Sequence, residues 1–154
     1  MNILEDLMNE HRTVLGRLNL LEEVEAGDDA TWALETVRGV AEFLEQDLEL
    51  HLQKEEKLLF PALAQRIGED GPIRVMLAEH VEMREGTKEL GRLGGQPELT
   101  ESDLAAVGDF VELVRGHIDK EDHILFPIAQ RELPGPVLEE LGGKAAALTL
   151  EEAQ

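Results

Sequence analysis

The chain contains one eleven-residue motif twice: HLQKEEKLLFP at residues 51–61 and HIDKEDHILFP at residues 117–127. Nine of the eleven positions are identical or similar. The segments that precede the two copies also match, because MNEH at residues 8–11 aligns with LAEH at residues 77–80. The chain therefore contains an internal repeat of two similar halves. Each half has one segment with a single histidine and one segment with the pattern His-x-x-x-Glu.

Apolar side chains recur every three or four residues along the segments that carry these motifs, which predicts helices. Aromatic residues make up only 3% of the chain, and strand-like alternation is missing. Turn residues at 27–29, 70–72 and 94–97 divide the sequence into four helical segments. We expect an all-α fold, an antiparallel up-down four-helix bundle over residues 1–132. Residues 133–154 are expected to form a short extra helix or tail packed on that bundle.

Two prolines follow the repeated motifs. The apolar stripe of the second helix is expected to run through Glu55 to Leu58, and that of the fourth helix through Glu121 to Ile124. Proline lacks an N–H group and its ring clashes with the preceding helical turn. We therefore expect each long helix to kink or end at its proline, Pro61 or Pro127.

Ionisable side chains interrupt the apolar stripes at six positions: His11, His51, Glu55, His80, His117 and Glu121. Residues four apart lie on one face of a helix, so each His-x-x-x-Glu pair can aim at a single point. Burying even one unpaired charge costs several kcal/mol, whereas a domain of this size has a net stability of about 5–15 kcal/mol. The six groups need a common reason for being buried.

A transition-metal site supplies that reason. Imidazole and carboxylate ligands suit iron, zinc, copper or nickel, whereas magnesium and calcium prefer sites made almost wholly of oxygen. Two metals, each held by two histidines and bridged by both glutamates, divide the six groups evenly and follow the repeat. Iron with open coordination positions fits a mixed set of histidines and carboxylates best.

Composition excludes several other classes of function. The 154 residues include 34 acidic and 14 basic side chains, a formal net charge of −20, which disfavours binding to nucleic acid or anionic lipid. There is no cysteine, so disulfides, thiolate nucleophiles and cysteine-ligated clusters are excluded. The most apolar stretch, Leu58 to Ala64, is too short to span a bilayer. We expect a cytoplasmic protein, either a monomer or a homodimer.

The order His, His-x-x-x-Glu, His, His-x-x-x-Glu, with Leu-Phe-Pro after each glutamate motif, resembles the hemerythrin-like (HHE cation-binding) domain family over about residues 1–130. The resemblance implies a four-helix bundle with a non-haem di-iron centre, in which carboxylates and an oxo or hydroxo group bridge the two irons. The ligands it implies are His11 and His51 for one iron, His80 and His117 for the other, and Glu55 and Glu121 as bridges.

Two positions depart from the oxygen-carrying members of that family. Those carriers have a fifth histidine one turn before the ligand of the third helix, where this chain has Met76. Their last histidine and carboxylate are five residues apart, which would select Asp122, whereas the internal repeat selects Glu121. Asp122 aligns with Glu56 and turns away from the stripe, so we favour Glu121. The missing histidine leaves one iron with an additional open position.

Several nearby residues are assigned structural roles. His123 lies well around the helix from Glu121 and is expected at the surface. Met76 is expected to pack in the core. Glu10 and Glu79 each precede a proposed ligand, and since adjacent residues do not share a helix face, we expect them to be solvated. Phenylalanines 60 and 126 are expected to close the end of the bundle.

These observations lead to three functional hypotheses. The first is a protein with two iron ions that binds oxygen or nitric oxide as a sensor, scavenger or store. The second is an enzyme in which the same centre reduces peroxide or nitric oxide. The third is an interaction module whose acidic surface changes its contacts when iron binds.

Overall fold

A computed structural model describes residues 2–150, and every regular element among them is a helix. The all-α prediction is confirmed. The elements are α1 (Ile3–Glu22), α2 (Ala30–Phe43), η1 (Leu44–Leu48), α3 (Glu49–Lys54), η2 (Glu55–Leu59), α4 (Phe60–Ile67), α5 (Pro72–Gly94), α6 (Glu101–Lys120), η3 (Glu121–Leu125), α7 (Phe126–Glu132) and α8 (Gly135–Ala147). The segments named η are π-helical turns, and they join their neighbours into continuous rods.

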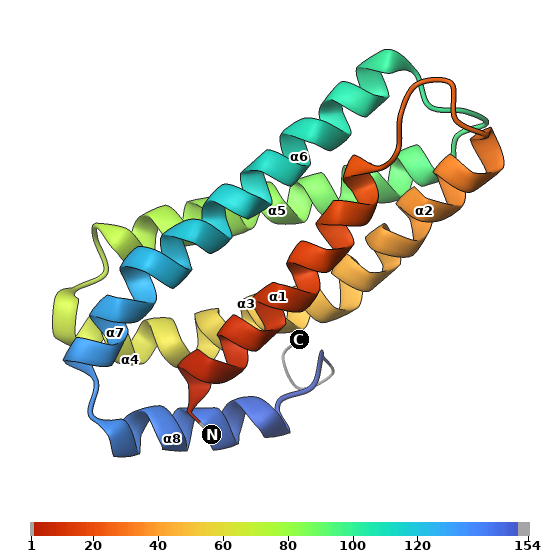
Figure 1. The fold of residues 1–154 in the computed structure, drawn as a ribbon. Coiled ribbons are helices and arrows are strands. Elements are labelled where there is room, and N and C mark those ends of the chain that lie inside the picture. Colours follow the sequence, from red (N-terminus) through yellow and green to blue (C-terminus); the bar gives the residue numbers. More distant parts are fainter. Residues whose placement is uncertain (1, 151–154) are drawn as a thin grey trace.

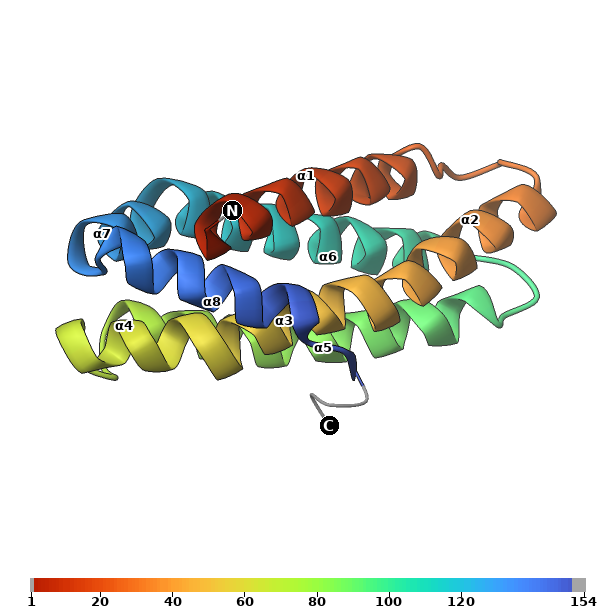
Figure 2. The ribbon, with the colours of Figure 1, turned by 90° about the horizontal axis from the view of Figure 1, so that it is seen from below.

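The long rods lie lengthwise beside one another and form a helical bundle (Figures 1 and 2). The packed pairs are α1 with α2, α2 with α5, α5 with α6, and α6 with α1. The short helix α8 packs on α1 and reaches η2. Among residues 2–150, no helix combines the length and apolar character that a membrane span requires. The last four residues of the expected tail, 151–154, lie outside the described residues.

Side chains from the preceding turns cap three of the helices. Asn2 accepts a hydrogen bond from the backbone N–H of Glu5, and Asp29 accepts one from that of Trp32. Thr100 and Asp103 form a reciprocal capping box at the start of α6. These contacts satisfy backbone donors that have no partner within the helix. The helix boundaries were therefore readable from local sequence.

Each long helix was expected to kink or end at its proline, and the structure excludes the end: the helix continues beyond Pro61 to Ile67 and beyond Pro127 to Glu132. A π-helical turn ends two residues before each proline, at Leu59 or Leu125. In the first copy, the N–H of Phe60 donates to the carbonyl of Glu55, five residues back. The wider turn accommodates the proline, whose missing N–H and bulky ring would disrupt a regular α-helix.

The same π turns correct the predicted stripe. Leu59 and Leu125 are fully buried, while Leu58 is only partly buried and Ile124 is 55% exposed. A π turn contains one more residue than an α turn, so the inward position after each site glutamate shifts by one residue. Both π turns begin at a site glutamate, Glu55 or Glu121.

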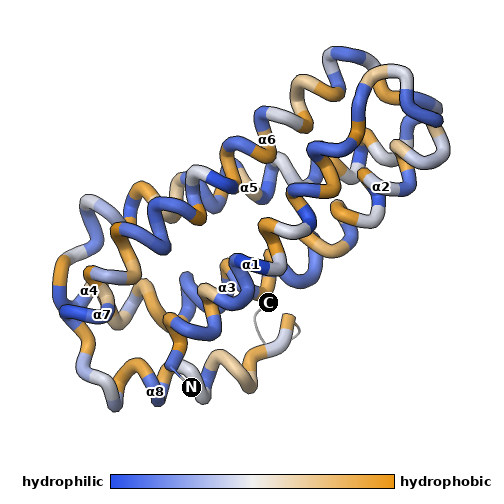
Figure 3. The backbone as a smooth tube through the Cα atoms, in the orientation of Figure 1, coloured by the Kyte–Doolittle hydropathy of each residue, from blue (hydrophilic) through white to orange (hydrophobic). Residues whose placement is uncertain are grey.

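The buried apolar side chains form two clusters along the bundle. One includes Val14, Leu48, Met83 and Val114, and the other includes Leu7, Leu59, Met76 and Leu125. In each rod the predicted site residues fall between a member of the first cluster and a member of the second. The tube coloured by hydropathy shows apolar and polar residues alternating along the rods (Figure 3). A buried polar layer therefore separates two apolar cores.

Close packing between α5 and α6 gives a test of this arrangement. A Cβ atom at Gly86 would overlap the ring of Phe110, whereas one at Gly16 would meet nothing within 4 Å. Gly86→Ala should lower the free energy of unfolding by about 1–3 kcal/mol through overpacking. Gly16→Ala should raise it by about 0.5–1 kcal/mol, because alanine favours helix more than glycine does. Urea unfolding of both variants checks this, and a stabilised Gly86→Ala variant would contradict the packing described here.

Candidate metal centre

All the predicted site side chains lie in the polar layer between the two apolar clusters. Their exposed fractions do not exceed 2%, and they are His11, His51, Glu55, His80, His117 and Glu121. Single ligand atoms of these residues gather into two groups, within each of which all the atoms lie within 4.8 Å of one another. One group contains His11 and His51, and the other contains His80 and His117. Glu55 and Glu121 belong to both groups.

The Nε2 atoms of the histidines face the two carboxylates. Nε2 of His11 lies 3.0 Å from Oε1 of Glu121, and Nε2 of His80 lies 3.1 Å from Oε1 of Glu55. Nε2 of His117 lies 3.4 Å from the same oxygen of Glu121 that His11 contacts. Imidazole nitrogens and carboxylate oxygens from all four long rods thus converge on the middle of the bundle.

Several of these close atoms make no hydrogen bond. Both carboxylate oxygens of Glu55, one of Glu121, and the Nε2 atoms of His80 and His117 are buried without a hydrogen-bond partner. These nitrogen and oxygen atoms lie close to one another, but the angles between them do not suit hydrogen bonds. Buried polar atoms without partners are costly and rare. Atoms that point at a common space satisfy the geometry of a shared cation, so the residues fit a metal.

The Nδ1 atom of each histidine is held by a carboxylate on another helix. Asp122 binds His11 at 2.7 Å and Glu10 binds His51 at 2.9 Å. Glu56 and Glu79 complete the set, with distances of 2.6 Å to His80 and 2.8 Å to His117. In chain order, each rod supplies the carboxylate for the histidine of the next rod, and the last rod supplies it for the first. We call these four carboxylates the outer ring.

This contradicts the expectation that Glu10 and Glu79 are solvated. Their exposed fractions are 32% and 14%, and each bridges a histidine of the next rod and a lysine. Adjacent residues do point to different faces of a helix, but the outward residue reaches sideways to the neighbouring helix. A repeated signal was available, since a carboxylate adjoins a predicted site residue once in every long helix: Glu10, Glu56, Glu79 and Asp122.

Basic side chains hold three members of the outer ring. Lys54 lies 2.6 Å from Glu10, and Lys120 pairs with Glu79 in the equivalent place of the second half. Arg84 binds Glu56 together with Glu49 on α3. A carboxylate that orients the distal nitrogen fixes the tautomer and direction of a histidine, as outer partners do at metal sites. The outer ring therefore turns the Nε2 atoms inward.

Aromatic rings cover the histidines with the same twofold repetition. Phe126 stacks on His11 and Phe60 stacks on His80, each with ring centres 5.5 Å apart. These phenylalanines are buried, and they belong to the apolar cluster that contains Leu59 and Leu125. They seal one side of the polar layer with the phenylalanine of each repeated motif.

The electrostatics of the layer are dominated by burial. Burial raises the pKa of Glu55 well above its usual value, and the charge of Glu121 acts in the same direction. Burial also acts to raise the pKa of Glu121, but its close interactions with Glu55, His11 and other neighbouring histidines hold that pKa well below its usual range. Burial lowers the pKa of His11, yet bonds to Asp122 and Glu121 outweigh it and raise the pKa to about 9. The pKa values of the paired glutamates are thus shifted in opposite directions, with that of Glu55 raised and that of Glu121 lowered.

The remaining residues discussed from sequence lie outside the converging groups. His123 is 74% exposed and pairs with Asp119 on its own helix. Met76 is buried in an apolar cluster, as expected for core packing. Asp122 is 23% exposed and contacts His11 from the outer side, whereas Glu121 is fully buried between the histidines. The structure therefore places Glu121, and not Asp122, in both groups.

A helical bundle whose interior brings histidines and glutamates to shared points belongs to the class of bundles that bind cations between their helices. The sequence matches the family described as the hemerythrin HHE cation binding domain over residues 2–129, and the chain belongs to that family. The resemblance found from the repeated motif is thus confirmed.

Two curated relatives share the name iron-sulfur cluster repair protein YtfE. The protein of Citrobacter koseri is 31% identical over an alignment of 104 residues, and the match covers 60% of this chain and 47% of that protein. The protein of Escherichia coli strain K12 / DH10B is 32% identical over an alignment of 95 residues, and the match covers 56% of this chain and 43% of that protein. The matched regions thus span less than half of these relatives. No solved structure gives a significant match.

The raised pKa of Glu55 predicts a pH-dependent stability difference. In protein stripped of metal with a chelator, the folded state takes up a proton at Glu55 that the unfolded state releases, so this contribution to stability falls as pH rises. Glu55→Gln removes that loss. The free energy of unfolding of the variant, relative to that of the wild type, should therefore increase by about 1–3 kcal/mol when the pH is raised from 5 to 7.5.

Urea unfolding at both pH values measures this gain. Glu42→Gln, on the exposed side of α2, is the matched control and should show no such trend. A Glu55→Gln gain that is equal at the two pH values would contradict the assigned protonation.

Proposed function

We propose that this protein is a non-haem di-iron protein that binds oxygen or nitric oxide at a carboxylate-bridged centre, as a sensor, scavenger or store. The observation that carries the proposal is that two groups of ligand atoms share Glu55 and Glu121. His11 and His51 would hold one iron, His80 and His117 the other, and the shared glutamates would bridge them. Bound iron supplies reversible redox chemistry and open coordination positions for a small ligand.

The choice of two metals follows from the number and placement of the donors. Four neutral imidazoles carry no charge, so two divalent ions would meet the two carboxylate charges within the layer, and solvent-derived ligands would balance the remaining positive charge. The choice of iron rests on the mixed nitrogen and oxygen donors and on the relatives, whose name concerns iron–sulfur clusters. Repair of such clusters is a property of those longer proteins. We carry over to this chain only the handling of iron.

The protein's own residues would prepare the centre in three ways. The outer ring fixes the direction of every imidazole, the stacked phenylalanines exclude water from one side, and the apolar clusters lower the local dielectric constant. Met76 stands where a further histidine would complete one half, and its thioether is a poor ligand for such an iron. We therefore propose that the half containing His80 has the additional open position for the small ligand.

We also propose the finer architecture on which this assignment depends: an antiparallel up-down four-helix bundle over residues 1–132, with residues 133–154 as an appended segment. Its support is the cyclic order of the packed pairs and the packing of α8 against α1. The cytoplasmic location and the monomeric or homodimeric state stay predictions.

Metal content tests the di-iron centre directly. We expect about two irons per chain, by mass spectrometry, in protein purified without added metal or chelator. The double variant His51→Ala/His117→Ala removes one histidine from each half and should lose both irons. Zinc in place of iron, or an undiminished metal content in the double variant, would overturn the proposal. Circular dichroism of the variant controls for loss of the fold.

Reversibility distinguishes binding from turnover. The reduced, iron-loaded protein should bind oxygen or nitric oxide and return to its original absorption spectrum when the gas is removed. Consumption of reductant beyond one equivalent per centre would favour the alternative function, an enzyme that reduces peroxide or nitric oxide. Phe60→Leu is a useful comparison, because it keeps an apolar cover over His80 while thinning it. Retention of the bound gas should fall in this variant.

The third hypothesis, an iron-responsive interaction module, predicts a different result for variants of the two glutamates. It requires that Glu55→Gln and Glu121→Gln change stability and partner binding together. Under the proposal made here, these variants change metal content and gas binding without requiring any protein partner.

A further inference from the structure

The outer ring is not symmetric between the two halves of the repeat. Arg84 stands four residues after His80, and the equivalent position, four residues after His11, is Leu15. The carboxylates that these positions would face are Glu56 and Asp122, which are equivalent in the repeated motif. This position is thus a cation, Arg84, in the half that contains His80, and an aliphatic residue, Leu15, in the half that contains His11.

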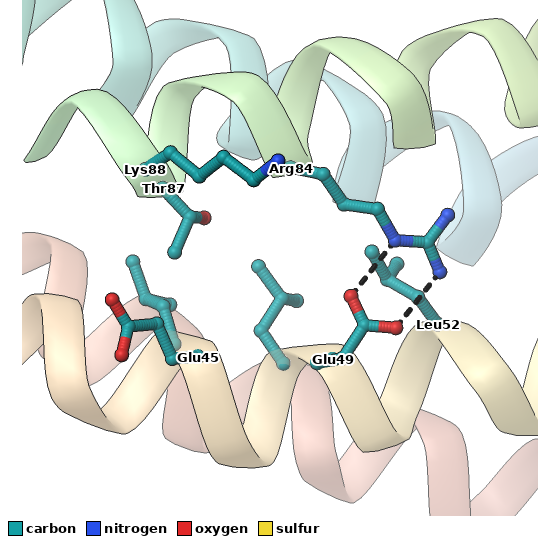
Figure 4. Close-up of a pocket in the computed structure, with 8 residues that line it drawn as sticks. Glu45, Glu49, Leu52, Arg84, Thr87 and Lys88 are labelled. Carbon is teal, nitrogen blue, oxygen red and sulfur yellow. Dashed lines mark hydrogen bonds and ion pairs between the residues drawn. The ribbon is translucent and has the colours of Figure 1, made fainter. Parts of the chain in front are cut away.

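Arg84 makes a dense set of contacts. Its Nη1 donates to Glu56 at 2.8 Å and its Nη2 donates to the other oxygen of Glu56 at 3.1 Å. Its Nε and Nη2 also donate to Glu49, at 2.8 and 3.0 Å. Figure 4 shows the guanidinium group lying over Glu49 at the edge of a surface cavity of about 330 Å³. The guanidinium group is therefore fixed beside the carboxylate that holds His80.

Asp122, the equivalent of Glu56, has no arginine beside it among the described residues. Among the described residues it forms an ion pair only with His11. The lysine pairs do not compensate for this difference, because Lys54 with Glu10 and Lys120 with Glu79 are equivalent in the two halves. The difference between Glu56 and Asp122 therefore comes from the guanidinium group of Arg84, which Glu56 shares with Glu49.

This difference acts on the inward face of the histidines. A carboxylate that accepts the Nδ1 proton makes the distal nitrogen a stronger electron donor. Two hydrogen bonds from a guanidinium group draw charge from Glu56, so Glu56 strengthens His80 less than Asp122 strengthens His11. Glu49 shares the guanidinium group and balances its charge, so Arg84 acts on the centre chiefly through the hydrogen bonds that it donates to Glu56.

We propose that Arg84 is a positioning residue that makes the two halves of the centre unequal. It acts through Glu56 and weakens divalent-cation binding by His80 and His117 relative to His11 and His51. The proposal rests on the two-metal centre proposed above. Its consequence is ordered loading, in which the half containing His11 fills first and the half containing His80 holds the more readily reduced metal.

Anaerobic titration of the metal-free full chain with Co²⁺, followed by visible absorption, measures the two binding steps separately. Wild type should bind two ions with unequal affinities. Arg84→Met should raise the affinity of the weaker step about tenfold, the lower end of what outer partners contribute at metal sites. Arg84→Lys keeps the charge, and its constants should stay within about threefold of the wild type.

Arg115→Met is the matched control. Arg115 has the same exposed fraction as Arg84, 30%, and binds Glu22 and Asn19 at 2.6 and 2.7 Å, away from the outer ring. Its loss should cost comparable stability and leave both Co²⁺ constants unchanged. An Arg84→Met variant that matches this control, or that binds Co²⁺ more weakly than wild type, would overturn the proposal, since a purely structural role predicts weaker binding.

A second pair of backgrounds locates the effect. His11→Ala impairs the stronger half and leaves the half containing His80 intact, so adding Arg84→Met should still raise the Co²⁺ affinity that remains. With His80→Ala, the added change should have no effect, and an equal gain in both backgrounds would contradict action through Glu56. Wild type that binds fewer than two ions would refute the two-metal function itself. Two ions with constants insensitive to Arg84 would refute only this inference.

Discussion

The structure depends on the burial of six ionisable side chains in one layer of the bundle. Two carboxylates and four imidazoles lie where the apolar cores meet, with exposed fractions of 2% or less. Some of their polar atoms have no hydrogen-bond partner. Such a layer opposes folding unless a charge of the opposite sign enters it, so the fold and its ligand are energetically coupled. The apolar clusters on both sides supply the stability that tolerates this layer.

The outer ring makes the orientation of each imidazole depend on how the helices pack. Because each rod provides the carboxylate for the histidine of the next rod, displacing one helix would rotate an imidazole on its neighbour. The lysines and Arg84 hold these carboxylates from the solvent side. The π turns add a second constraint, since they begin at Glu55 and Glu121 and place the following leucine and phenylalanine inward. The structure of the site thus depends both on the side-chain contacts of the outer ring and on the backbone geometry of the π turns.

Much of the fold and the inner set of residues could be predicted from local patterns. Helix stripes, caps and turns depend on residues near one another in the chain, and His51 with Glu55 share a face by helix geometry alone. The errors arose where a different helix or an altered helical period decided the outcome. Glu10 and Glu79 looked solvated on their own helices, and Leu58 and Ile124 looked inward under a regular period. Neither a neighbouring helix nor a π turn is visible in the spacing of one segment.

The repeat, the helical class and the identity of the buried donors follow from the order of the amino acids, because they depend on periodicity and on the cost of burying charge. The folded chain was needed to show which carboxylate meets which imidazole and where the two proline-containing helices change their period. It also decided that Arg84 stands beside one half of the layer and Leu15 beside the other half. These outcomes depend on the distances between helices, and the spacing of residues along the chain does not contain those distances.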